Sequence, residues 1–189
     1  PSNLNKITFG VDVNDVSYDK FRERSDSLRL NIPSFQVSTI DESVIGSSVD
    51  TKSAIIDDLS NTTPFIMSLM GHGASDRWGG NNTLNQIDAF AMTNEKMPVV
   101  LAWNCETAWY FSPLRTEKSL GEQLVLNSNG GSVLFMGSTT MTTPPAQEKL
   151  AKSFFSILES ETSSYYTGQR FGDILREAKV ATSGQKYEN

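Results

Sequence analysis

The two residues of this 189-residue chain best suited to nucleophilic chemistry are its only histidine, His72, and its only cysteine, Cys105. An imidazole that takes the proton of a thiol creates a strong nucleophile, and the imidazolium can then protonate a leaving amine. Taken singly, a free cysteine is usually a small buried hydrophobe and a lone histidine is usually a structural residue. Their matching positions, each just after an apolar segment, favour a Cys/His nucleophilic site.

The apolar segments before His72 and Cys105 are typical of buried strands. FIMSLM, at 65–70, leads into the GHG sequence at 71–73, and MPVVLAW, at 97–103, leads through Asn104 to Cys105. Nearly continuous apolar runs indicate strands that are covered on both faces in a parallel sheet. The carboxyl ends of parallel strands meet at one edge, where ligands bind in open α/β sheets. We therefore expect both side chains to flank one small substrate group.

The loops at this edge are predicted to supply the substrate pocket. Trp78 follows the histidine by six residues and either walls a pocket or covers the sheet edge. A further strand is predicted at 132–137, and the Ser/Thr/Pro-rich loop after it becomes a third wall if that strand is parallel to the others. The predicted pocket residues are Trp78, Glu106, Thr139, Met141 and Pro144.

An acidic loop follows the first predicted strand, which spans 7–11 and ends at Asp12. Asp12 and Asp15 in this loop could bind a cation or contact a basic substrate. Asp is common in turns, however, because its side chain bonds to the nearby backbone. Solvated turn residues are therefore the favoured interpretation of this pair.

Segments with helical spacing of apolar residues alternate with the predicted strands. They span about 18–28, 50–59, 119–126, 147–158 and 171–181. Such alternation predicts one α/β domain over 1–189, with a mostly parallel sheet, helices on both faces and right-handed crossovers.

Composition excludes several classes of function. The net charge of -6, with no Lys/Arg cluster, argues against a nucleic-acid partner. No apolar run has the length of a membrane-spanning helix. A single cysteine rules out an internal disulfide framework and a cysteine-rich metal site.

Three segments carry a family resemblance: MSLMGHGASDRWGG, MPVVLAWNCETAWYFSP and LGEQLVLNSNGGSVLFMGSTT. They resemble the gingipain-type cysteine peptidases of the caspase-like clan, from about Ile7 to the C-terminal helices. The resemblance implies a caspase-like three-layer sandwich. It also implies that His72 is the catalytic histidine and Cys105 the nucleophile. The backbone N–H groups of Gly73 and Cys105 would form the oxyanion hole that stabilises charge on the scissile carbonyl.

The sequence departs from this family pattern in several places. Flanking strands that family members have before and after the matched region are missing, so we expect a fragment, a processed piece or a reduced relative. Pro144 stands where arginine-specific members have an aromatic residue, so no preference for the residue before the scissile bond is implied. Members often bind calcium, but no ligand motif places such a site here, and no other cofactor is predicted. The resemblance further implies a bacterial protein that is secreted or at the cell surface, and it leaves the oligomeric state open.

The predicted function is cysteine endopeptidase activity on protein or peptide substrates through a Cys105 acyl-enzyme. One alternative is a sortase-like transpeptidase of a secretion pathway, because an amine can capture the same acyl-enzyme in place of water. Another is a non-catalytic peptide-binding or scaffolding domain of the same fold, which the missing strands favour and the His72/Cys105 pair opposes.

Overall fold

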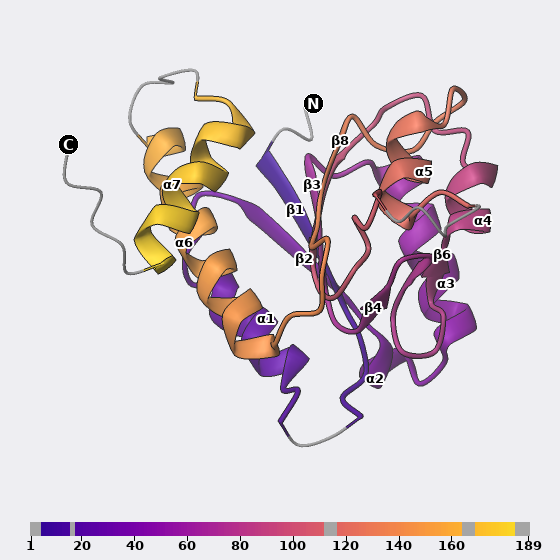
Figure 1. The fold of residues 1–189 in the computed structure, drawn as a ribbon, viewed down its shortest axis with the longest axis horizontal. Helices are drawn as coiled ribbons and strands as arrows, with labels where there is room; N and C mark the ends of the chain where they lie inside the picture. Colours follow the sequence, from indigo (N-terminus) through magenta and orange to yellow (C-terminus); the bar gives the residue numbers. More distant parts are fainter. Residues whose placement is uncertain (1–4, 16–17, 112–116, 164–168, 184–189) are drawn as a thin grey trace.

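A five-stranded parallel sheet forms the centre of the computed structural model, which describes residues 5–15, 18–111, 117–163 and 169–183 (Figure 1). The strands lie in the spatial order β2-β1-β3-β7-β8, and every neighbouring pair is parallel. In chain order they are β1 (Lys6–Val11), β2 (Gln36–Asp41), β3 (Ile66–Met70), β7 (Val99–Trp103) and β8 (Leu134–Met136). The predicted parallel sheet is confirmed, and its carboxyl edge faces the bottom of Figure 1.

Helices cover both faces of this sheet (Figure 1). One face packs against α1 (Phe21–Arg29), α6 (Pro144–Ser163) and α7 (Phe171–Ser183). The other face packs against α3 (Ser48–Asp57), α4 (Gln86–Ala91) and α5 (Leu120–Leu126), while the short α2 (Glu42–Ile45) follows β2 directly. Successive side chains of each central strand enter opposite cores because strand side chains alternate between faces. The predicted α/β sandwich is confirmed.

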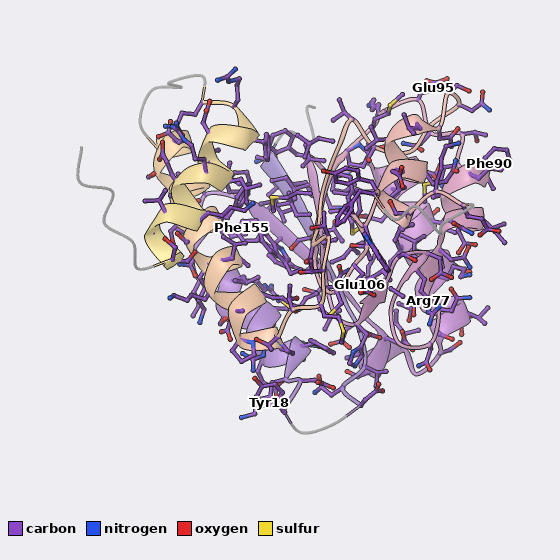
Figure 2. The ribbon with its side chains drawn as sticks, in the orientation of Figure 1. Tyr18, Arg77, Phe90, Glu95, Glu106 and Phe155 are labelled. Atoms are coloured by element: carbon purple, nitrogen blue, oxygen red, sulfur yellow. The ribbon has the colours of Figure 1, made fainter. Side chains whose placement is uncertain are left out.

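Aromatic residues dominate the core between the sheet and α6. Phe154 and Phe155 pack edge to face with ring centroids 5.8 Å apart, and Phe155 lies 5.7 Å from Phe9 of β1. Figure 2 shows Phe155 on the sheet side of its helix. Trp103, at the end of β7, packs against both phenylalanines. Because aromatic rings bury about 150–250 Å² each, this cluster fixes the end of β7 just before Cys105.

A small antiparallel sheet lies immediately after His72 and was not predicted. Its strands are β4 (Gly73–Ala74), β5 (Arg77–Trp78) and β6 (Leu84–Asn85), in that spatial order. Two-residue strands are too short to show a period-2 pattern, so the sequence carried no signal for them. The sheet anchors the chain after His72 to the second core, in which Trp78 is fully buried.

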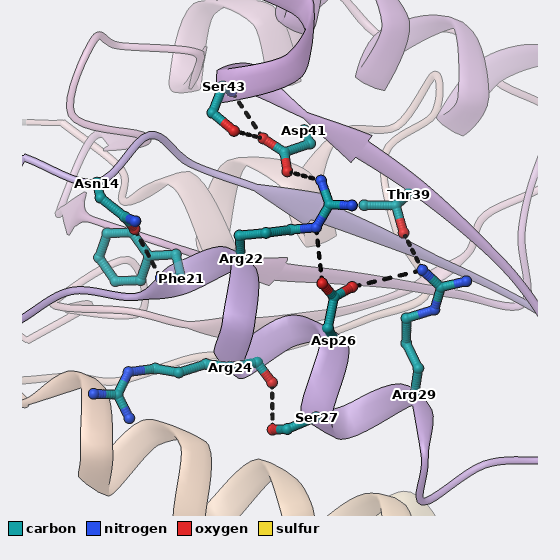
Figure 3. Close-up of polar contacts among 10 residues, drawn as sticks. All are labelled: Asn14, Phe21, Arg22, Arg24, Asp26, Ser27, Arg29, Thr39, Asp41 and Ser43. Carbon is teal, nitrogen blue, oxygen red and sulfur yellow. Dashed lines mark hydrogen bonds and ion pairs between the residues drawn. The ribbon is translucent and has the colours of Figure 1, made fainter. Parts of the chain in front are cut away.

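Polar contacts hold the start of α1 beneath the carboxyl edge of the sheet (Figure 3). The Phe21 N–H donates to Asn14 Oδ1 at 2.8 Å. Arg22 pairs with Asp41 at the end of β2, and its Nε lies 2.9 Å from Asp26 Oδ2 one turn along the helix. These contacts set the position of Phe21, which packs beside His72.

The helix predicted at about 18–28 spans Phe21–Arg29, and two others differ in extent from the sequence prediction. The helix predicted at 147–158 spans Pro144–Ser163, because proline is well tolerated in the first turn and the pattern continues past Leu158. The helix predicted at 50–59 ends at Asp57 and continues as a π-helical turn over Asp58–Thr62. Within the described ranges, no helix combines the length and the apolar character needed to cross a membrane.

Candidate active site

His72 and Cys105 lie at the same edge of the sheet. β3 and β7 are neighbours, with Met70 opposite Trp103, and each candidate residue lies two positions beyond this pair. Both side chains are half-buried. The two loops therefore lie as expected: His72 and Cys105 follow adjacent parallel strands at one edge of the sheet.

Gly73 packs the histidine loop directly against the cysteine loop. A Cβ atom at this position would lie 2.4 Å from the carbonyl oxygen of Cys105 and 2.9 Å from Asn104 Cγ. Contacts this short are not tolerated, so only glycine fits without movement of one loop. The backbones of Gly73 and Cys105, whose N–H groups are the predicted oxyanion hole, are thus in close contact.

The imidazole of His72 contacts two acidic side chains and one aromatic ring. Its Nε2 lies 3.2 Å from Asp15 Oδ2 and 3.4 Å from Asp19 Oδ2. Neither contact has the alignment of a hydrogen bond, so each is an ion pair only when the ring is protonated. The edge of the Phe21 ring packs on the imidazole, with centroids 5.0 Å apart and planes at 89°. The Nε2 atom of His72 therefore lies between two carboxylates and beside an aromatic edge.

Asp12 holds the backbone, not the ring, of His72. It is 2% exposed, and its Oδ2 accepts the N–H groups of His72 at 2.9 Å and Gly80 at 3.0 Å. Its Oδ1 accepts the N–H of Val13 at 2.9 Å. Burial raises the pKa of Asp12, and the two backbone hydrogen bonds oppose that rise. The favoured interpretation as a solvated turn residue is wrong for Asp12, whereas the Asp15 side chain is 63% exposed.

The sulfur of Cys105 contacts the loop that follows β8. Its Sγ donates to the carbonyl oxygen of Thr142 and accepts the Thr142 N–H, each at 3.4 Å. No hydrogen bond joins Sγ to His72. The next residue, Glu106, has a left-handed backbone with φ of 56°, and its N–H donates to Thr140 O at 3.2 Å. A non-glycine residue in this conformation costs on the order of 1–3 kcal/mol, and such strain clusters at functional sites.

A cavity of about 330 Å³ adjoins the cysteine loop. It lies between the ends of β7 and β8 and helices α6 and α7. Asn104, the residue before Cys105, and Thr142, the partner of its sulfur, both line it. Its walls also include the polar residues Ser138, Thr139, Gln147 and Lys179, together with apolar side chains from both strands and both helices. The volume falls in the usual range for small ligand pockets, roughly 300–1,000 Å³.

The residues predicted to form the pocket occupy different surroundings. Thr139 lines the cavity. Glu106, labelled in Figure 2, lies beside Cys105 and is half-buried, Pro144 begins α6, and Met141 is exposed. Trp78 is 0% exposed and does not line the cavity, so its burial fits the alternative interpretation, in which it covers the sheet.

Three polar residues near His72 and Cys105 were not predicted from the sequence. Asp19 reaches His72 from a loop without periodicity, so no pattern marks it. Asn104 precedes Cys105 and is almost fully buried. Gln147 lies on the buried side of α6, and a glutamine at a buried position of an amphipathic helix is a signal that could have been read.

The described residues do not provide a fit for calcium, which the family resemblance suggests. Among them, no group of three or more His, Cys, Asp or Glu side chains is arranged to hold a metal ion.

Comparisons with known proteins agree with this architecture. The model of Peptidase family C25 matches residues 2–189. The chain is similar to the crystal structure of the Arg-specific cysteine proteinase gingipain R, with 15% identity, a TM-score of 0.77 and coverage of 98% of this chain. It is also similar to the complex of the pro- and mature domains of RgpB from Porphyromonas gingivalis, with 16% identity, a TM-score of 0.67 and 95% coverage. The match covers 43% of each of those chains. A search of curated proteins found no match.

At these identities the structural matches establish the caspase-like fold, and the family assignment follows from the sequence model. That model covers nearly every residue, including both strand-end loops with His72 and Cys105. The chain therefore belongs to peptidase family C25, the gingipain family.

Proposed function

We propose that this chain is a cysteine endopeptidase domain in which Cys105 is the nucleophile and His72 transfers protons. The observation that carries the proposal is the position of both residues at one edge of adjacent parallel strands, with Gly73 packed on the backbone of Cys105. The family membership supports the same reaction class.

The proposed reaction begins when His72 takes the proton of Cys105 Sγ. The sulfur then forms a bond to the peptide carbonyl carbon, and the N–H groups of Gly73 and Cys105 stabilise the oxyanion. The C–N bond breaks as the imidazolium gives its proton to the leaving amine. Water, activated by the neutral imidazole, hydrolyses the thioester and restores the thiol.

The carboxylates around His72 support its role as a proton carrier. Asp15 and Asp19 lie within 3.4 Å of His72 Nε2, so an imidazolium formed between the two proton transfers would face two carboxylates. The absence of a hydrogen bond between His72 and Cys105 is compatible with catalysis, because such contacts are often loose without substrate and tighten in its complex.

A non-catalytic peptide-binding domain is the second candidate, and one observation favours it. Cys105 Sγ is engaged with the backbone of Thr142 and not with His72. In a binding domain this contact would be permanent, and the thiol would be inert. Alkylation by iodoacetamide near pH 7 separates the two functions, because an activated thiol reacts much faster than a model thiol.

The central test uses peptide acyloxymethyl ketones that differ at P1, the residue before the scissile bond, and measures labelling by intact-protein mass spectrometry. We expect one label per chain at Cys105, loss of labelling in Cys105→Ala, and a rate lowered at least about 100-fold in His72→Ala. Peptidase turnover that persists in folded Cys105→Ala would reject the assignment. Absence of any label on the folded chain would favour the binding function.

Two finer points remain part of the proposal. Transpeptidation shares the acyl-enzyme with hydrolysis, so a candidate amine added to a cleavage reaction should yield a ligated product only if the domain transfers to amines. A secreted or surface location follows from the family resemblance and is tested by fractionation of the source cells.

A further inference from the structure

We propose, resting on the function above, that the ion pair between Arg24 of α1 and Glu148 of α6 is a positioning pair for the reaction. It joins the loop that faces His72 to the helix that follows the loop in contact with Cys105. Both residues act through the segments that they hold and not on the substrate itself.

Arg24 holds the chain just before α1. Its Nε donates to the carbonyl oxygen of Asp19 at 2.8 Å, and its Nη2 donates to that of Tyr18 at 3.3 Å. The next residue, Lys20, has a left-handed backbone with φ of 48°, and its side chain does not cap the helix. A non-glycine residue keeps such a conformation only when its surroundings fix it. The guanidinium of Arg24 supplies two of the hydrogen bonds that fix this turn.

The turn held by Arg24 places Asp19 against the histidine. The Asp19 side chain is 6% exposed, and its Oδ2 lies 3.4 Å from His72 Nε2. The same oxygen accepts the N–H of Asp15 at 2.9 Å, and the Asp15 carboxylate lies 3.2 Å from His72 Nε2. A displacement of Asp19 would therefore change both acidic contacts of the imidazole.

Glu148 anchors Arg24 to α6. Its carboxylate accepts from Arg24 Nη1 and from Ser27 Oγ at 3.0 Å, and it pairs with Lys152 at 2.6 Å. Burial opposes the ionisation of Glu148, but these hydrogen bonds outweigh it and lower the pKa of the carboxyl. The Arg24 and Glu148 side chains are only 12% and 18% exposed, so salt screens this pair less than a surface pair. Figure 3 shows Arg24 and Ser27 on the side of α1 next to the faint orange ribbon of α6.

The start of α6 leads from Glu148 to the cysteine. Gln147, the preceding residue, donates through its Nε2 to Thr142 Oγ1. The backbone of Thr142 in turn contacts the sulfur of Cys105. A continuous series of contacts therefore joins the loop beside the histidine to the cysteine through the ion pair.

Arg24→Met tests the role of the pair, with Lys6→Met as the matched control. Lys6 pairs with Asp58 at 2.8 Å, and their side chains are 19% and 12% exposed, but Lys6 begins β1 at the opposite edge of the sheet. Each variant removes one largely buried cation and keeps a side chain of similar length. We expect the maximal rate of Cys105 labelling, at saturating ketone probe, to fall at least about tenfold in Arg24→Met and to stay near the wild-type value in Lys6→Met.

The single histidine provides a readout that does not depend on labelling. An NMR spectrum of the untagged chain contains one set of imidazole signals, which belongs to His72. We expect their chemical shifts to change in Arg24→Met, because Asp19 moves relative to the ring, and to keep the wild-type values in Lys6→Met.

Glu148→Met removes the other half of the pair and should slow labelling as Arg24→Met does. The double variant should be no slower than the single variants, because both substitutions break one contact. Circular dichroism checks that each variant is folded.

A wild-type labelling rate or an unchanged His72 signal in folded Arg24→Met would overturn the positioning role. A wild-type labelling rate in folded Glu148→Met would overturn the connection through α6. Either result would leave the peptidase assignment standing, whereas failure of every probe to label wild-type Cys105 would overturn that assignment together with this one.

Discussion

Replacement of Gly73 by alanine is the sharpest test of how the loops that carry His72 and Cys105 pack together. The new Cβ would lie 2.4 Å from the Cys105 carbonyl oxygen, whereas real Cβ atoms essentially never approach closer than 3.0 Å. The loops must therefore separate by at least about 0.6 Å. Gly73 is not among the glycines with positive φ, so alanine brings no backbone strain of its own. The effect of the substitution is purely steric.

The size of the expected effect follows from this displacement. A misplacement near 1 Å in an active site costs about 100-fold in rate, which corresponds to about 2.7 kcal/mol of transition-state stabilisation. Overpacking of a close contact also destabilises a fold by about 1–3 kcal/mol. We therefore expect Gly73→Ala to lower the rate of Cys105 labelling by roughly 30- to 100-fold and the free energy of unfolding by about 1–3 kcal/mol.

The assay is the time course of labelling with the fastest ketone probe, together with urea denaturation followed by fluorescence. Gly172→Ala is the matched control, because nothing lies within 4 Å of a Cβ at that position in α7. It should label at the wild-type rate and gain a few tenths to about 1 kcal/mol from better helix propensity. Wild-type labelling and stability in Gly73→Ala would refute the inferred contact between the two loops.

Three further substitutions probe the supports of the site. Burial raises the pKa of the Asp12 carboxyl. The stability that this shift contributes is fully present below the ordinary pKa of 3.8 and is lost as the pH rises through the folded pKa. Asp12→Asn cannot titrate, so urea denaturation from pH 3 to 7 should show that this decline is absent in the variant. Phe21→Ala removes a buried ring whose edge packs on His72, so we expect a loss of about 3–5 kcal/mol in urea denaturation and slower labelling of Cys105; equal stability to wild type would contradict the packing. Trp103→Phe removes the indole N–H that donates to the buried Ser68 Oγ at 3.0 Å. Thermal unfolding should report a loss of about 1–3 kcal/mol in the free energy of unfolding. The double variant with Ser68→Ala should recover part of that loss, because it also removes the unpaired hydroxyl.

The sheet could be predicted because its central strands are covered on both faces. β3 and β7 are nearly continuous apolar runs that end in glycine or polar residues, and this pattern indicates buried parallel strands. The positions of His72 and Cys105 at one edge then follow from topology alone. The ends of α6 could not be predicted as closely, because helix boundaries depend on local contacts that periodicity does not encode.

The side-chain partners of the site could not be predicted from local pattern. Asp12 accepts N–H groups of residues that follow it by 60 and 68 positions, so its burial depends on the tertiary fold. The same residue type in an isolated loop would indeed favour a solvated turn. Gly73 likewise gains its steric role only when β7 is beside β3. Long-range contacts of this kind decide which of the candidate polar residues reach the site.

The contact between Asp12 and His72 constrains the backbone of the histidine and not its ring. The Asp12 carboxylate accepts the backbone N–H of the histidine, while the imidazole contacts the edge of Phe21 and two other carboxylates. The ring can therefore turn about its side-chain bonds without breaking a backbone hydrogen bond. Rotamer changes of accessible side chains take picoseconds to nanoseconds, whereas loops rearrange over nanoseconds to microseconds. Rotation of the His72 side chain is thus separate from the hydrogen bonds that hold its backbone.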